Sequence, residues 1–67
     1  MAFRKGSKVE LTRAVATAPS GSCGKVTQVY KNGNYRVRIT HDPGCVELVF
    51  PTHLASVPPA ALRACNC

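Results

Sequence analysis

The dipeptide Asn32-Gly33 constrains the fold of this chain more than any other feature of its sequence. Both central residues of a type I′ hairpin turn need a positive φ, which Asn and Gly adopt at low cost. After it, residues 35–40 alternate apolar and polar side chains, which is typical of a strand with one buried face. Before it, residues 25–30 are expected to form the partner strand. The chain is therefore expected to fold into antiparallel β-structure.

The segment before this hairpin predicts one more strand and a long loop. Residues 8–12 alternate polar and apolar side chains and indicate a first strand, whereas residues 13–24 are rich in Pro, Ser and Gly and indicate a connecting loop. In the following strand, Val26 and Val29 would fall on opposite faces of a regular ladder. This spacing indicates a bulge, a sharp bend or a strand buried on both sides.

The second half of the chain predicts two further strands. Residues 42–44, Asp-Pro-Gly, form a turn signal before a fourth strand over residues 45–50. A single 3₁₀ turn is expected over residues 51–54, followed by a short closing strand over residues 55–57. Two prolines then end the sheet, because proline cannot donate to a ladder, and leave residues 58–67 as a Pro/Ala/Cys tail.

Together these elements predict an all-β fold, a small five-stranded barrel over residues 1–57 with a short C-terminal tail. The chain has only 67 residues, and ordering them costs on the order of 100 kcal/mol, which so little core barely offsets. A partner, a metal, a disulfide or self-association is therefore expected to contribute to stability. The expected core consists of Val9, Leu11, Val26, Val29, Tyr35, Val37, Ile39, Val46, Leu48, Phe50 and Leu54.

Four segments carry a resemblance to SH3-like barrels: residues 5–11, 24–30, 34–39 and 50–54. Within them, Gly-x-x-Val-x-Leu, a loop, Gly-Lys-Val-x-x-Val and a hairpin look like the KOW segment of ribosomal and transcription-elongation proteins, over about residues 5–40. This resemblance implies RNA binding. The chain also resembles, less closely, the photosystem I accessory subunit of this fold and the type II dihydrofolate reductases.

The dihydrofolate reductase resemblance rests on residues 44–51, which are similar to the family's Gly-x-Val-Gln-Ile-Tyr-Pro. It implies a tetramer in which Val46, Glu47, Leu48 and Phe50 face a central pore. Glu47 replaces the family's Gln, Phe50 replaces its Tyr, and one extra residue precedes the Pro. The alternative is an ordinary strand that closes the barrel, with its apolar side chains on the inner face.

Positive charge is the main indication of function. Lys and Arg outnumber Asp and Glu by nine to three, for a net charge of +6, and several occupy outward positions of the expected strands. Such a face would attract phosphate or an acidic protein surface, although outward Lys and Arg also simply keep a small sheet soluble. The expected binding residues are Lys8, Arg13, Lys25, Tyr30, Lys31, Arg36 and Arg38, with Tyr30 or Tyr35 as a stacking surface.

The four cysteines lack the paired Cys-x-x-Cys spacing of structural zinc sites, so neither a metal nor a cofactor is predicted. Cys65 and Cys67, with Cys23 and Cys45, remain weak candidate ligands, which His41 or His53 could join. Otherwise Cys23 and Cys45 are expected to be small buried hydrophobes, and the tail pair to be exposed and reactive.

These features favour a non-catalytic binding or accessory module that docks onto a larger assembly or an acidic surface through its basic face. Two alternatives stay open: RNA binding of KOW type, and an oligomeric pore enzyme of type II dihydrofolate reductase kind. No catalytic residue is predicted. The absence of an apolar leader or spanning segment favours a cytoplasmic protein without a membrane span, which could form a homo-oligomer.

Overall fold

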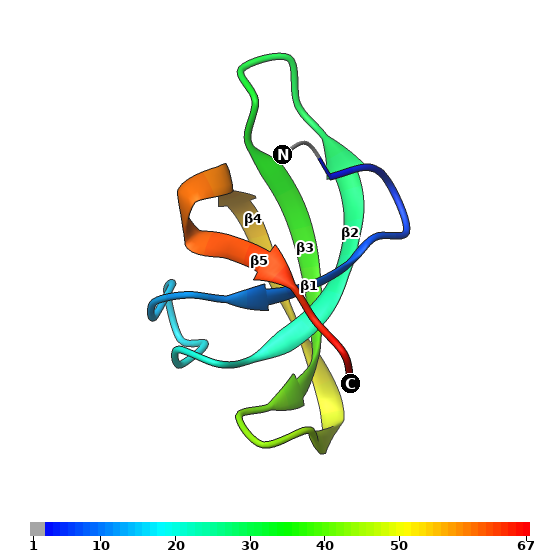
Figure 1. The fold of residues 1–67 in the computed structure, drawn as a ribbon, viewed down its shortest axis with the longest axis vertical. Coiled ribbons are helices and arrows are strands. Elements are labelled where there is room, and N and C mark those ends of the chain that lie inside the picture. Colours follow the sequence, from blue (N-terminus) through cyan, green and yellow to red (C-terminus); the bar gives the residue numbers. More distant parts are fainter. Residues whose placement is uncertain (1–2) are drawn as a thin grey trace.

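The computed structural model describes residues 3–67, which form one five-stranded antiparallel sheet (Figure 1). The strands are β1 (Lys8–Leu11), β2 (Cys23–Val29), β3 (Tyr35–Asp42), β4 (Val46–Val57) and β5 (Leu62–Ala64). Their order in the sheet is β4-β3-β2-β1-β5, so the last strand lies beside the first. The all-β prediction and the number of strands are therefore confirmed.

The hairpin between β2 and β3 lies where Asn32-Gly33 predicts it. The expected type I′ geometry is wrong, because Gly33 has a φ of +91° whereas Asn32 does not have a positive φ. The amide of Asn34 instead donates to the side-chain oxygen of Asn32. The expected irregularity in β2 is a bulge: Val26 pairs with Val37 and Gln28 pairs with Arg36, which leaves Thr27 unpaired. The bulge changes which face of β2 points inward, as the spacing of Val26 and Val29 indicates.

The end of the chain differs from the prediction. Residues 51–57, expected as a 3₁₀ turn and a separate closing strand, all belong to the twelve-residue strand β4. The 3₁₀ helix η1 occupies Pro59–Ala61, and the fifth strand is Leu62–Ala64, which pairs with β1. Because β5 is a member of the sheet, part of the segment expected as a C-terminal tail belongs to the fold.

The core lies against the inner faces of β1, β2 and β3. Seven of the expected core residues are buried: Val9, Leu11, Val26, Tyr35, Val37, Ile39 and Leu54. Leu48 is half-buried against them. The cluster is completed by side chains that the sequence pattern did not single out, namely Ala18, Val57, Ala61 and Leu62.

The prediction of burial is wrong for three of the expected core residues. Val29, Val46 and Phe50 are 48%, 58% and 82% exposed. For β4 the reason is its register on β3, in which His41 pairs with Glu47 but Ile39 pairs with Thr52. An advance of two residues along β3 is thus matched by an advance of five residues along β4. The segment between Glu47 and Thr52 therefore bulges away from the inner face, and Val49 and Phe50 are exposed.

Candidate functional site

Three basic side chains lie in a row across neighbouring strands on the outer face of the sheet. Lys8 on β1 pairs with Lys25 on β2, and Lys25 in turn pairs with Arg38 on β3. All three are exposed, and Arg38 pairs further with the exposed His53 of β4. Residues directly opposite in an antiparallel pair have Cβ atoms about 5 Å apart on one face. We call Lys8, Lys25 and Arg38 the cationic row.

The row leaves its positive charge uncompensated. Within residues 3–67 the ion pair that forms is between Arg63 and Glu10, on the neighbouring β5–β1 pair. Arg63 Nε donates to Glu10 Oε2 at 2.5 Å, so Glu10 is engaged by Arg63. Like charges directly opposite one another on a sheet are destabilising by a few tenths of a kcal/mol or more. The fold therefore carries a local cost that an anion on this face would remove.

The other expected binding residues are placed differently. Arg36 is exposed two residues before Arg38 and pairs with Gln28, so it extends the row along β3. Arg13 lies in the β1–β2 loop and Lys31 in the β2–β3 turn, and both are exposed outside the row.

The two tyrosines do not form an open stacking surface. Tyr35 is only 4% exposed, its hydroxyl accepts a hydrogen bond from the Phe3 amide, and its ring meets that of Phe3 edge-on at 5.7 Å. Tyr30 is half-buried, and its hydroxyl donates to the carbonyl oxygen of Ala55 at 2.7 Å. Both rings therefore serve to hold the hairpin on its neighbours.

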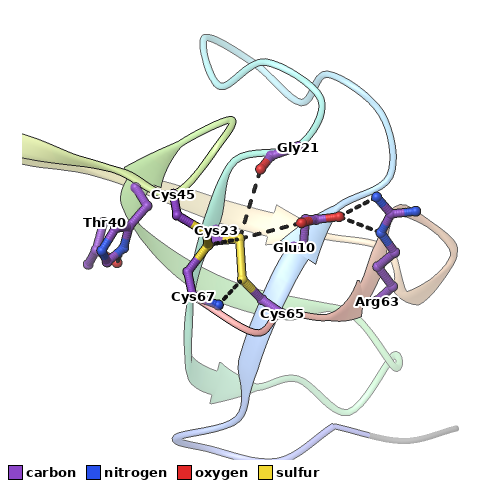
Figure 2. Close-up of a disulfide and its surroundings, with 9 residues drawn as sticks. Glu10, Gly21, Cys23, Thr40, Cys45, Arg63, Cys65 and Cys67 are labelled. Carbon is purple, nitrogen blue, oxygen red and sulfur yellow. Dashed lines mark hydrogen bonds and ion pairs between the residues drawn. A yellow bond between two sulfur atoms is a disulfide. The ribbon is translucent and has the colours of Figure 1, made fainter.

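All four cysteines form disulfides, and disulfides are among the sources of stability that the short chain predicts. Cys23, at the start of β2, is bonded to Cys65, and Cys45, in the β3–β4 turn, is bonded to Cys67 (Figure 2). Cys23 and Cys65 are 2% and 8% exposed, whereas Cys45 is exposed. Cys45 is therefore not a buried hydrophobe, and Cys65 does not belong to a mobile tail. The pairing could not follow from spacing, because four cysteines allow three connectivities.

The two disulfides lie against each other, beside the cationic row. Cys67 Sγ is 3.5 Å from Cys23 Sγ. A small pocket there is lined by Lys8, Cys23, Gly24, Lys25, Thr40, His41, Cys65 and Cys67. We call the four cysteines the sulfur cluster. Its members come from three separate parts of the chain, and the pairing of β5 with β1 brings Cys65 and Cys67 to β2.

Comparisons with protein-family models, with curated proteins and with solved structures find no match. In the part of the chain that the structure describes, no helix is long and apolar enough to cross a membrane. Function must therefore be argued from the cationic row, the exposed apolar side chains of β4 and the sulfur cluster.

Proposed function

We propose that this protein is a non-catalytic binding module that docks onto an acidic surface of a larger protein assembly through the cationic row. The observation that carries the proposal is the pairing of Lys8 with Lys25 and of Lys25 with Arg38, three exposed cations opposite one another. Three cations held side by side raise the local positive potential of this face, and such a potential attracts carboxylates.

An SH3-like fold is part of this proposal. Three features support it: a long loop between β1 and β2, a 3₁₀ turn directly before the last strand, and the pairing of that short strand with the first. The KOW resemblance would make nucleic acid the ligand instead. The engaged positions of Tyr30 and Tyr35 favour the acidic protein surface, because single-stranded nucleic acid binds best where bases stack on free aromatic rings.

The proposal is tested by fluorescence anisotropy with two labelled probes of equal charge, a polyglutamate peptide and a single-stranded RNA. We expect the peptide to bind at low ionic strength and to dissociate as salt rises. Absence of peptide binding at low salt would refute the proposal. Binding of RNA at least about tenfold more tightly than the peptide, a preference of about 1.4 kcal/mol, would replace it with the nucleic-acid function.

Two triple variants show whether the row itself binds. Lys8→Gln/Lys25→Gln/Arg38→Gln removes the row, and Lys5→Gln/Arg13→Gln/Lys31→Gln removes three exposed cations elsewhere, so both lower the net charge from +6 to +3. Binding should be lost in the first variant and largely kept in the second. Equal losses would mean that only net charge matters.

A second candidate function is the oligomeric pore enzyme. It is favoured by one observation: Val46 and Phe50, which the dihydrofolate reductase resemblance places at a pore, are exposed and available to other copies of the chain. An assembly of identical chains would cover them. Sedimentation at micromolar concentration decides this candidate, because a monomer could not build the shared pore.

Cytoplasmic location remains part of the proposal, and it depends on the state of the cysteines. Disulfides persist in oxidising compartments and are rare in the cytosol. In the cytoplasm the Cys23–Cys65 and Cys45–Cys67 bonds would be exposed to reduction, beginning at the exposed Cys45. The chemistry of the reduced sulfur cluster therefore matters for this location.

A further inference from the structure

The fold gathers four sulfur atoms from three separate parts of the chain. Cys23 comes from the start of β2, Cys45 from the β3–β4 turn, and Cys65 and Cys67 from the segment after β5 (Figure 2). The sulfurs of Cys23, Cys65 and Cys67 all lie within 4.8 Å of one another. The sulfur of Cys45 lies outside this group of three, but it is bonded to the sulfur of Cys67, so it is one bond away from the group.

This spacing suits a metal. In a tetrahedral zinc site with Zn–S bonds of about 2.3 Å, the sulfur atoms are about 3.8 Å apart. The observed separation of 3.5 Å between the sulfurs of Cys67 and Cys23 is close to that value. Once the disulfides are opened, bonded sulfurs need to move apart by less than about 2 Å to reach tetrahedral positions. We propose that the reduced protein binds one Zn²⁺ through the thiolates of Cys23, Cys45, Cys65 and Cys67.

The surroundings favour the charge of such a site. A zinc ion with four thiolates carries a net charge of −2, and the pocket beside the sulfurs is lined by Lys8 and Lys25. One acidic group also faces the cluster, because Glu10 Oε1 lies 3.6 Å from Cys23 Sγ. Its charge is offset by Arg63, whose Nε donates to the other carboxylate oxygen. Lys8, Lys25 and Arg63 therefore outnumber the single carboxylate of Glu10 beside Cys23, Cys65 and Cys67.

The two disulfides become the zinc site in two steps, reduction of the disulfides and then binding of the metal. Two molecules of a dithiol each give two electrons and two protons to one protein disulfide, so that four cysteine thiols form and each dithiol becomes a cyclic disulfide. Binding of Zn²⁺ then releases four protons and forms four Zn–S bonds. The Cys45–Cys67 bond is attacked first, because Cys45 is exposed whereas Cys23 and Cys65 are buried.

The metal would replace what reduction removes. The disulfides tie the C-terminal segment to β2 and to the β3–β4 turn, across 42 and 22 residues of sequence. A small domain with little core depends on such cross-links. A zinc ion held by the same four sulfurs makes both connections at once, so the fold would keep its C-terminal strand in either redox state.

Cobalt(II) is the probe that tests this site, because four-thiolate Co²⁺ has a characteristic visible absorption and sulfur-to-metal charge-transfer bands. The full chain is reduced with dithiothreitol, desalted without oxygen and titrated with Co²⁺ and then Zn²⁺. We expect the tetrahedral spectrum to saturate at one Co²⁺ per chain and to vanish on addition of Zn²⁺. All four thiols should resist iodoacetamide until a chelator is added. Absence of the tetrahedral spectrum, or full alkylation in the presence of Zn²⁺, would overturn the proposal.

Variants define the ligand set. Cys45→Ser should weaken Co²⁺ binding by at least about tenfold, the size of effect expected for loss of a metal contact, and should lower the charge-transfer intensity. His41→Ala, beside the cluster, and the matched control His53→Ala on β4 should leave the spectrum unchanged. If His41→Ala rather than Cys45→Ser changes it, the proposed four-thiolate set is wrong.

A denaturant control separates a folded site from chelation by a flexible chain. In concentrated urea the spectrum should disappear, because the cysteines are brought together by the pairing of β2 with β3 and of β5 with β1. Persistence of the full spectrum in urea would contradict a site built by the fold.

Discussion

The two ends of β3 lie in different surroundings. Over Tyr35–Ile39 it pairs with β2 and contributes Tyr35, Val37 and Ile39 to the core. Towards the β3–β4 turn, the adjoining part of β4 exposes Val46, Val49 and Phe50, so that this tip has few buried apolar contacts. Cys45 ties the tip to the C-terminal residue. One end is thus held by burial and the other by a covalent bond.

Among the variants that test the contrast between burial and covalent linkage, those without a disulfide should show the largest loss in the free energy of unfolding. In the chain-entropy description, the free energy of unfolding should fall by about 4 kcal/mol in Cys23→Ala/Cys65→Ala, which opens a cross-link between residues 42 apart. In Cys45→Ala/Cys67→Ala, which opens a cross-link between residues 22 apart, it should fall by about 3 kcal/mol. Urea unfolding of the oxidised, metal-free variants measures both values. A negligible loss in the second pair would mean that the tip needs no tether.

Truncation of one buried core side chain and of one exposed side chain near the tip gives the next largest effect. Leu11 is fully buried, and Leu11→Ala should lower the free energy of unfolding by about 3 kcal/mol. Phe50 is 82% exposed, and Phe50→Ala should change it by less than about 0.5 kcal/mol. Thermal and urea unfolding check the pair. A large loss in Phe50→Ala at concentrations where the protein self-associates would instead support the oligomer.

Substitution of Gly24 tests the effect of a steric clash, and substitution of Gly44 tests the effect of backbone strain. A Cβ at Gly24 would lie 2.0 Å from the carbonyl oxygen of Arg38, so Gly24→Ala must push β2 and β3 apart. We expect a loss of about 3 kcal/mol. At Gly44, with a φ of +85° and nothing within 4 Å of the added Cβ, Gly44→Ala should cost only about 1 kcal/mol of strain. Similar losses would show that β2 and β3 can adjust.

The well-packed end is also the end that the sequence predicts. Val37 and Ile39 alternate with Arg36 and Arg38 because one face of β3 is buried and the other is exposed to solvent. This alternation can be recognised in the amino-acid sequence. The Asn-Gly turn is equally local. Both features depend on neighbours in sequence, so they can be derived without the fold.

The features that the sequence did not predict depend on distant partners. β4 has an apolar run at residues 46–50 like that of a core strand, but its register shift on β3 between Glu47 and Thr52 leaves Val49 and Phe50 exposed. Leu62–Ala64 is too short to indicate a strand by itself and is held by pairing with β1. The sulfur cluster depends on that same pairing, so neither its connectivity nor its compactness could be derived from spacing. The sequence predicts that the members of the cationic row lie at outward positions of their strands. That they lie directly opposite one another follows only from the register of β1, β2 and β3.

Reversal of one charge in the row gives the smallest change in stability, and it carries the most information about function. Lys25 lies between Lys8 and Arg38, so Lys25→Glu replaces two repulsive neighbours with two attractive ones. The free energy of unfolding should rise by about 0.5 kcal/mol. Lys31→Glu in the β2–β3 turn is the matched control and should leave it within about 0.3 kcal/mol of wild type.

The most direct test of the central claim is the affinity of Lys25→Glu for the labelled polyglutamate peptide at low ionic strength. If the cationic row is a docking surface, this variant should be at least as stable as wild type and yet bind the peptide at least about tenfold more weakly, while Lys31→Glu binds almost as well as wild type. Equal affinity of the two variants would contradict the account.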